Sequence, residues 1–121
     1  MNSKKQLSGS LQISQDVIAT IASVAAQEID GVASVAQHAP GLQRNPLKKN
    51  YKKPVDVVVA DGLAQIDIGV TLNYGAKIGE VCTKVQSAVK DNVQSMTGMA
   101  VSKVNVFVAR IAFPAEEQVS N

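Results

Sequence analysis

The chain has 121 residues, the usual size of one domain, and 45% of them are apolar, so it can bury a core of its own. It contains no Trp and only two Tyr and two Phe, so that core must be built from Val, Ile, Leu, Ala and Met. A formal net charge of +2 is too small to mark the whole domain as a nucleic-acid-binding protein.

The expected compartment follows from one cysteine and from the shortness of the apolar runs. Cys82 is the only cysteine, so no intrachain disulfide can form, which suits a reducing compartment. The first ten residues hold two lysines with no apolar stretch behind them, so we expect no secretory signal there. The most apolar run, residues 17–26, is about half as long as the ~20 residues that a membrane-spanning helix needs. We therefore expect a cytoplasmic protein without a transmembrane segment of its own.

The first predicted element is a helix over residues 14–29. Ser14 can cap the free N–H groups of its first turn, and Ile13 and Ile18 have the spacing of a hydrophobic staple. Apolar residues then recur with the helical period, namely Val17, Ile18, Ile21, Ala22, Ala25 and Ile29. Gly31 stands where a left-handed residue would end the helix. The apolar residues 32–36 are a candidate for a short strand.

Residues 37–54 have a different composition. They hold three of the four prolines and no acidic residue, which predicts a long loop without regular structure. Five of the twelve basic residues lie here within ten positions, namely Arg44, Lys48, Lys49, Lys52 and Lys53. Such a run can bind a phosphate backbone, anionic lipid heads or an acidic protein segment, or it can be a solvated loop with no partner. Charge counting does not decide between these alternatives.

From Val55 the apolar period becomes two, on both sides of Asp61-Gly62. This dipeptide between two alternating runs predicts a β-hairpin with a type I′ turn. The apolar residues then face one another on one side of the sheet, as the pairs Val59 and Ala64, Val57 and Ile66, and Val55 and Ile68. The same register puts Asp56 opposite Asp67 on the other side, which is unfavourable for like charges. We expect this pair to be solvated, screened or balanced by a lysine on a neighbouring strand, with a cation site as the alternative.

A second helix is predicted between Tyr74-Gly75 and Gly98, and a last strand from about residue 100 to 111. The apolar stripe of this helix consists of Ile78, Val81, Cys82, Val85, Ala88, Val89, Val93 and Met96. The strand puts Val104, Val106 and Val108 on one face.

A strand, a helix and a strand in this order predict a parallel crossover unit. The expected fold is α/β (α+β), a two-layer sandwich with a mixed sheet of four or five strands and two helices on one face. One domain over residues 10–113 is expected, with flexible ends at 1–9 and 114–121.

Residues that could support catalysis or metal binding are sparse. His38 is the only histidine and lies in the loop, so any Ser-His-Asp or Cys-His arrangement would depend on one mobile residue. Cys82 lies on the apolar stripe, which is typical of an inert core thiol. No cluster of Cys, His or carboxylates has the spacing of metal ligands, and residues 75–79 match neither phosphate-loop pattern. We therefore expect no catalytic residue, no metal and no cofactor.

Four short segments, taken in order, resemble a known family. They are Glu28-Ile29-Asp30-Gly31-Val32, Tyr74-Gly75, Met96-Thr97-Gly98 and Val104-Asn105-Val106-Phe107-Val108. Over about residues 10–111 the chain resembles the alkaline-shock-protein-like envelope stress-response family of Gram-positive bacteria. The resemblance implies an abundant, non-enzymatic cytosolic protein. It also implies self-association and a small membrane-anchored partner that places some members at the inner face of the cell membrane. The basic loop is longer here than in the family pattern, and Gly79 stands where members often have proline.

The leading hypothesis is therefore an interaction or scaffold protein of the cell-envelope stress response, which acts through self-association and a protein partner. A small nucleic-acid-binding module that uses the basic loop is the alternative, and an enzyme is a third. The outer face of the sheet is expected to carry Val58, Phe107 and Ile111 among polar residues, and such a face is a natural docking place for another chain. Scattered apolar residues are also ordinary on monomers. The candidate partner-binding residues are the five basic residues of the loop and Phe107.

Overall fold

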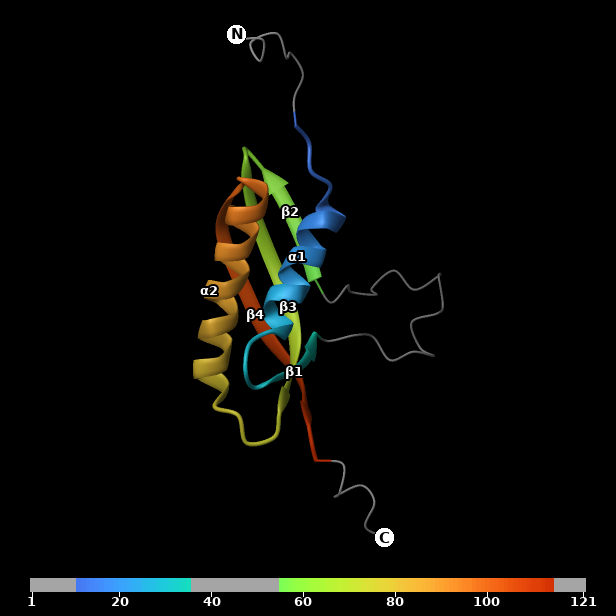
Figure 1. Ribbon diagram of the computed structural model, residues 1–121, viewed down its shortest axis with the longest axis vertical. Coiled ribbons are helices and arrows are strands. Elements are labelled where there is room, and N and C mark those ends of the chain that lie inside the picture. The colour runs from blue at the N-terminus through green and yellow to red at the C-terminus, as the bar shows by residue number, and fades with distance from the viewer. Residues whose placement is uncertain (1–10, 36–54, 115–121) are drawn as a thin grey trace, which may run out of the picture.

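Two helices cover one face of a four-stranded sheet in the computed structural model, which describes residues 11–35 and 55–114 (Figure 1). The elements in chain order are α1 (Gln15–Gln27), β1 (Val32–Val35), β2 (Val55–Ala60), β3 (Leu63–Asn73), α2 (Ile78–Thr97) and β4 (Ala100–Ala112). The predicted α+β two-layer sandwich is confirmed. The loop expected at 37–54 and, except for Pro114, the flexible ends expected at 1–9 and 114–121 lie outside the described residues.

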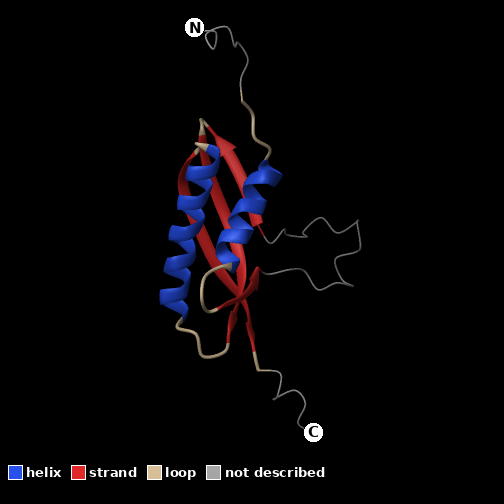
Figure 2. Cartoon of the chain, in the orientation of Figure 1, coloured by secondary structure: helices blue, strands red, loops and turns tan. Residues whose placement is uncertain are grey.

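β3 is the central strand and has partners on both edges. β4 pairs with it in parallel along its whole length, from Leu63 opposite Ala100 to Asn73 opposite Ala112, as the crossover unit predicts. On the other edge, β2 pairs antiparallel with residues 63–68 of β3, and β1 pairs antiparallel with residues 70–72. β1 and β2 therefore lie end to end along one edge of β3, and β4 occupies the other edge (Figure 2).

The hairpin of β2 and β3 has the predicted turn and register. Asp61 and Gly62 have φ values of 55° and 76°, so both adopt the positive φ that a type I′ turn requires. The register pairs Val55 with Ile68, Val57 with Ile66 and Val59 with Ala64, as expected. These side chains lie under the helices, where Ile66 and Ile68 are fully buried.

α1 begins at the predicted cap and ends earlier than predicted. The Ser14 Oγ accepts a hydrogen bond of 3.1 Å from the Val17 N–H. The C-cap is Glu28 in a right-handed conformation, so Gly31 does not end the helix. Gly31, with φ of 102°, instead lets the backbone approach α2, because a Cβ at this position would lie 2.8 Å from Cγ2 of Val81.

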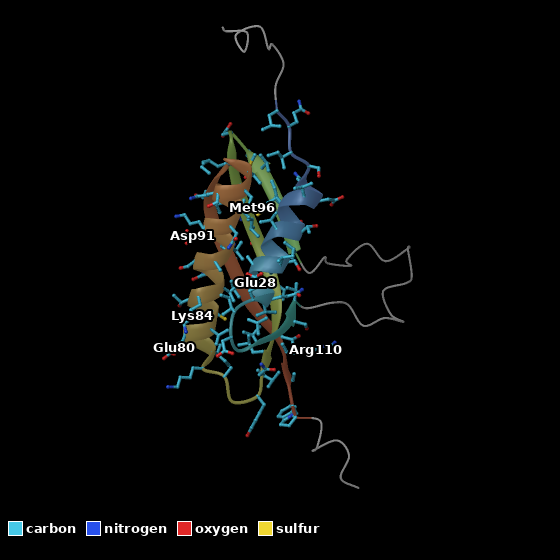
Figure 3. All side chains as sticks on the ribbon, viewed as in Figure 1. Glu28, Glu80, Lys84, Asp91, Met96 and Arg110 are labelled. Atoms are coloured by element: carbon cyan, nitrogen blue, oxygen red, sulfur yellow. The ribbon has the colours of Figure 1, made fainter. Side chains whose placement is uncertain are left out.

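α2 buries a narrower stripe than the sequence predicts. Gly98 ends it in a left-handed conformation with φ of 76°, as expected. The buried residues recur every four positions, namely Val81, Val85, Val89 and Val93. Ile78 and Met96 are 50% and 68% exposed, and Cys82 is half-buried, so the prediction was wrong for these three. α2 lies over β4, at the side of the sheet, and its single line of valines packs into the common core (Figure 1). Its charged residues Glu80, Lys84 and Asp91 point away from the sheet (Figure 3).

A bulge in β4 changes which face its last residues occupy. Val70 pairs with Val108, but the next residue of β3, Thr71, pairs with Arg110, so Ala109 is the extra residue. Ile111 consequently lies opposite Leu72 and packs against the core. The prediction that Ile111 lies on the outer face was therefore wrong, because regular alternation does not continue through a bulge.

Candidate functional site

The face of the sheet that the helices leave uncovered carries three large apolar side chains. Val58, Leu63 and Phe107 are 54%, 43% and 49% exposed. Val58 and Phe107 were expected on this face, whereas Leu63 was missed. The hairpin register could have identified Leu63, since it shares the parity of Gln65, which pairs with Val58. These three residues are called the outer apolar set below.

Phe107 lies directly over a glycine of the central strand. Gly69 is its pairing partner in the parallel register. A Cβ added to Gly69 would lie 2.6 Å from Cζ and 2.9 Å from Cε2 of Phe107, so the ring occupies the place of the missing side chain. Gly69 is buried although it is on the uncovered face. Phe107 therefore shields the backbone of β3 with one side of its ring and offers the other side to solvent.

A polar row separates Phe107 from Val58 and Leu63. Asp56, Asp67 and Asn105 lie opposite one another across three strands. The Nδ2 of Asn105 donates a hydrogen bond of 2.7 Å to Oδ1 of Asp67. The expected lysine is not opposite the pair, because Lys103 pairs with Gln65. In the part of the chain that the structure describes, no three His, Cys, Asp or Glu side chains are grouped to hold a metal ion, so the alternative of a cation site gains no support.

The outer edge of β4 is closed over its first half by two glutamines of α2. The Oε1 of Gln94 accepts a hydrogen bond of 3.1 Å from the Val101 N–H. The Nε2 of Gln86 donates one of 3.1 Å to the Val104 carbonyl. The sequence gives no sign of these contacts, since Gln86 and Gln94 resemble ordinary solvated residues of a helix surface.

Tyr74 and Phe113 form an exposed aromatic pair at one end of the sheet. Their ring centroids are 5.0 Å apart with an angle of 34° between the planes, and the residues are 61% and 52% exposed. The Tyr74 N–H donates a hydrogen bond of 2.9 Å to the Ala112 carbonyl, which holds the two chain segments together. This pairing was not predicted.

Cys82 has the environment of a structural thiol. Burial raises the pKa of the Cys82 thiol above its usual value of 9.0. A reactive cysteine needs the opposite shift, because the thiolate is the nucleophile. The interpretation of Cys82 as an inert residue therefore has a physical basis, although the side chain is only half-buried.

A cavity of about 430 Å³ lies between α1 and the edge formed by β1 and β2. Its lining includes Asp16, Thr20 and Ser23 of α1, together with Val35 and Val55. Val35 and Val55 directly flank residues 36–54, which lie outside the described residues. We assign no ligand to the cavity.

Of the six predicted partner-binding residues, the structure describes only Phe107. Arg44, Lys48, Lys49, Lys52 and Lys53 lie outside the described residues, so their role stays a prediction. Of the helices in residues 11–35 and 55–114, neither has the length and apolarity needed to cross a membrane.

Comparison with known proteins adds a family and a fold. Residues 3–113 match the model of the alkaline shock protein 23 family, which is described as having a cell envelope-related function. An uncharacterized protein of Streptococcus pyogenes serotype M6 is 36% identical over 89% of this chain and 92% of its own. The uncharacterized Bacillus subtilis proteins YloU and YqhY are 38% and 32% identical over 83% and 91% of this chain, and over 86% and 82% of their own lengths.

Among solved structures, two variants of MamM-CTD have a similar fold. Both give a TM-score of 0.51, with 12% and 11% identity, and cover 80% of this chain and 99% and 98% of theirs. Identity this low shows a shared fold and nothing about function.

Proposed function

The chain belongs to the alkaline shock protein 23 family, whose described function is related to the cell envelope, and we propose that it acts there as an interaction protein and not as an enzyme. In this proposal the chain is a scaffold of the cell-envelope stress response. It associates with itself and with a protein partner. A small membrane-anchored partner would bring it to the inner face of the cell membrane, as the family resemblance implies.

The observation that carries the proposal is the uncovered face of the sheet. Both helices pack on the opposite face, so the outer apolar set is left half-exposed with no element of the described chain above it. Removing apolar surface from water is favourable by about 25 cal/mol per Å², a gross gain from which the entropy cost of association is subtracted. The polar row between Phe107 and Val58 adds hydrogen-bonding groups that give such an interface specificity.

Sedimentation velocity over a wide range of protein concentrations tests this proposal. The native chain should associate as its concentration rises, and Phe107→Lys should weaken the association by placing a charge in the contact. Val17→Lys is the matched control, because Val17 is an apolar residue of similar exposure, 47% against 49% for Phe107, on the solvent side of α1. Equal association of both variants would move the interface away from Phe107, and a native chain that stays monomeric would remove self-association from the proposal.

The nucleic-acid-binding alternative depends only on the basic run between Arg44 and Lys53. No group in the described residues supports it further. The rings of Tyr74 and Phe107, which could have stacked successive bases, do not pair, since Tyr74 pairs with Phe113. An interaction protein is therefore the function that the geometry supports best.

A further inference from the structure

β4 lies at the edge of the sheet, and its outer edge has two different halves. Its only strand partner in the described chain is β3. An unpaired edge is a template on which another strand can form backbone hydrogen bonds. In the first half, Gln94 and Gln86 already bind the Val101 N–H and the Val104 carbonyl. Another strand cannot pair there without displacing these side chains.

The second half of the edge offers two residues for pairing. In a strand, both backbone groups of one residue point to the same edge and those of the next residue point to the other. The Val104 carbonyl points outward to Gln86, so Val106 and Val108 also direct their N–H and C=O outward. No hydrogen bond within the described residues reaches these groups. The bulge at Ala109 then interrupts the alternation. The open part of the edge is therefore Val106–Val108.

We propose that a second copy of this chain pairs antiparallel with β4 at Val106–Val108, with Phe107 of one copy opposite Phe107 of the other. This inference deepens the proposed self-association and rests on it. In this register Val106 of each copy faces Val108 of its partner. The outward N–H and C=O groups of Val106 and Val108 in each copy then all have a hydrogen-bonding partner in the other copy, across a two-fold axis. The two sheets join into one continuous sheet.

Neighbouring registers are less favourable. Centring the pair on Val106 would place Val104 opposite Val108, but the Val104 carbonyl is already bonded to Gln86. Centring it on Val108 would require regular geometry at the bulge of Ala109. Gln86 and the bulge thus select one register.

The side chains are also compatible with a second copy. Phe107 would meet its own copy at a non-hydrogen-bonded position, where the Cα atoms of antiparallel strands approach to about 4.5 Å and the side chains are close. Aromatic pairs at such positions are favourable. Within the paired window Phe107 faces Phe107 and Val106 faces Val108, so no charged residue is paired there, and the bulge at Ala109 interrupts the register beyond it. The ring that shields Gly69 within one copy would also be the centre of the interface.

Cysteine cross-linking in a Cys82→Ala background tests the register. Phe107→Cys should give a disulfide-linked dimer under mild oxidation, because the ~4.5 Å between Cα atoms lies within the ~4.4–6.8 Å of disulfides. Lys103→Cys is the matched control, since it is exposed on the same face of the same strand, and it should stay monomeric. A second pair keeps Phe107 in place and avoids the bulge: Val106→Cys chains mixed with Val108→Cys chains should form mixed dimers, because the Cα atoms of a hydrogen-bonded antiparallel pair lie about 5.5 Å apart. This pair decides the outcome if Phe107→Cys does not fold.

The outcomes separate this inference from the proposed function. If the native chain sediments as an oligomer but neither cross-link forms, or if Lys103→Cys links as readily as Phe107→Cys, the β4 register is wrong and self-association stands. If the native chain is monomeric at every concentration, both the register and the proposed self-association fail.

Discussion

The ring of Phe107 fills the space that a side chain at Gly69 would occupy, with only 2.6 Å between its Cζ and the position of an added Cβ. This contact predicts the effect of Gly69→Ala. Glycine in a strand normally costs about 0.5–1 kcal/mol relative to alanine, and here the added methyl would displace the ring. Because the ring is half-exposed, it can rotate outward. We expect a change in the free energy of unfolding below about 1 kcal/mol, together with clearly weaker self-association.

Urea denaturation and sedimentation of the same Gly69→Ala sample provide the two readouts. Loss of most of the stability would show that Phe107 cannot move and that the pair is primarily structural. Unchanged association would show that the position of the ring does not matter for the interface.

Replacement of Asn105 tests the polar row. Asn105→Ala removes the hydrogen bond to Asp67 and leaves this carboxylate opposite Asp56, so we expect a loss of about 1 kcal/mol in the free energy of unfolding. Asn105→Lys places a positive charge beside the two carboxylates and should lose less. Chemical denaturation at low and high salt measures the free energy of unfolding of both variants, and high salt should reduce the difference between Asn105→Ala and Asn105→Lys. Equal losses for both variants would mean that the repulsion between Asp56 and Asp67 is negligible.

The glutamines of α2 are expected to control how much of the β4 edge is open. Each lost hydrogen bond should lower the free energy of unfolding by about 0.5–1.5 kcal/mol. Gln86→Ala also frees the Val104 carbonyl, so this variant should associate more strongly and in more than one register. Gln27→Ala on α1 is the control, because within the described residues its side chain hydrogen-bonds to Ser23 of its own helix. Light scattering against time gives the comparison. A Gln86→Ala chain that associates like the native one would show that the edge needs no such closure.

Cys82 should react slowly in the folded chain. Burial raises the pKa of its thiol in the folded state, so the folded state holds its proton more tightly than the unfolded state. The resulting stability is present below the unfolded pKa and is lost as pH rises through the folded pKa. Thiol labelling of native and urea-unfolded protein against pH checks this, with the native curve displaced to higher pH. Faster labelling of the native protein would reopen a nucleophilic role. Because the side chain is half-buried, Cys82→Ala should cost only about 1 kcal/mol.

The basic run gives a prediction that separates the two function classes. An interaction protein should elute from heparin at low salt, as expected from a net charge of +2. A nucleic-acid-binding module would be retained, and the logarithm of its affinity for a random oligonucleotide would fall by about 0.7–0.9 per phosphate contact with the logarithm of salt. Replacing Lys48, Lys49, Lys52 and Lys53 with serine would then abolish the retention. Strong, salt-dependent retention that these replacements remove would favour the nucleic-acid alternative.

The sequence predicts the parts of the fold that depend on local geometry. The register of the hairpin of β2 and β3 was predicted correctly to the residue, because Asp61-Gly62 fixes the turn and the turn fixes the register. The helix caps at Ser14 and Gly98 were also recognisable, since capping depends on a few neighbouring residues. The order strand, helix, strand also predicted that β3 and β4 run parallel.

The register of that parallel pairing could not be predicted, because 20 residues of α2 lie between the two strands and nothing local sets their alignment. The contact between Gly69 and Phe107 and the inward position of Ile111 both follow from this register and its two irregularities, at Ser102 and at Ala109. The stripe of α2 was predicted too wide, because an apolar pattern does not show how much of it a narrow sheet covers. The position of Phe107 on the outer face was predicted from the alternation of side chains along its strand, whereas the roles of Gln86 and Gln94 depend on tertiary contacts.

Amide hydrogen exchange at Val106 and Val108, measured by NMR at low and high protein concentration, tests the central claim most directly. The N–H groups of Asn105 and Phe107 point toward β3 and serve as internal controls, protected at both concentrations. We expect the Val106 and Val108 amides to exchange rapidly in the dilute protein and to become protected as the concentration rises. Exchange at these two amides that stays equally fast in a sample that sedimentation shows to be associated would contradict pairing through the β4 edge.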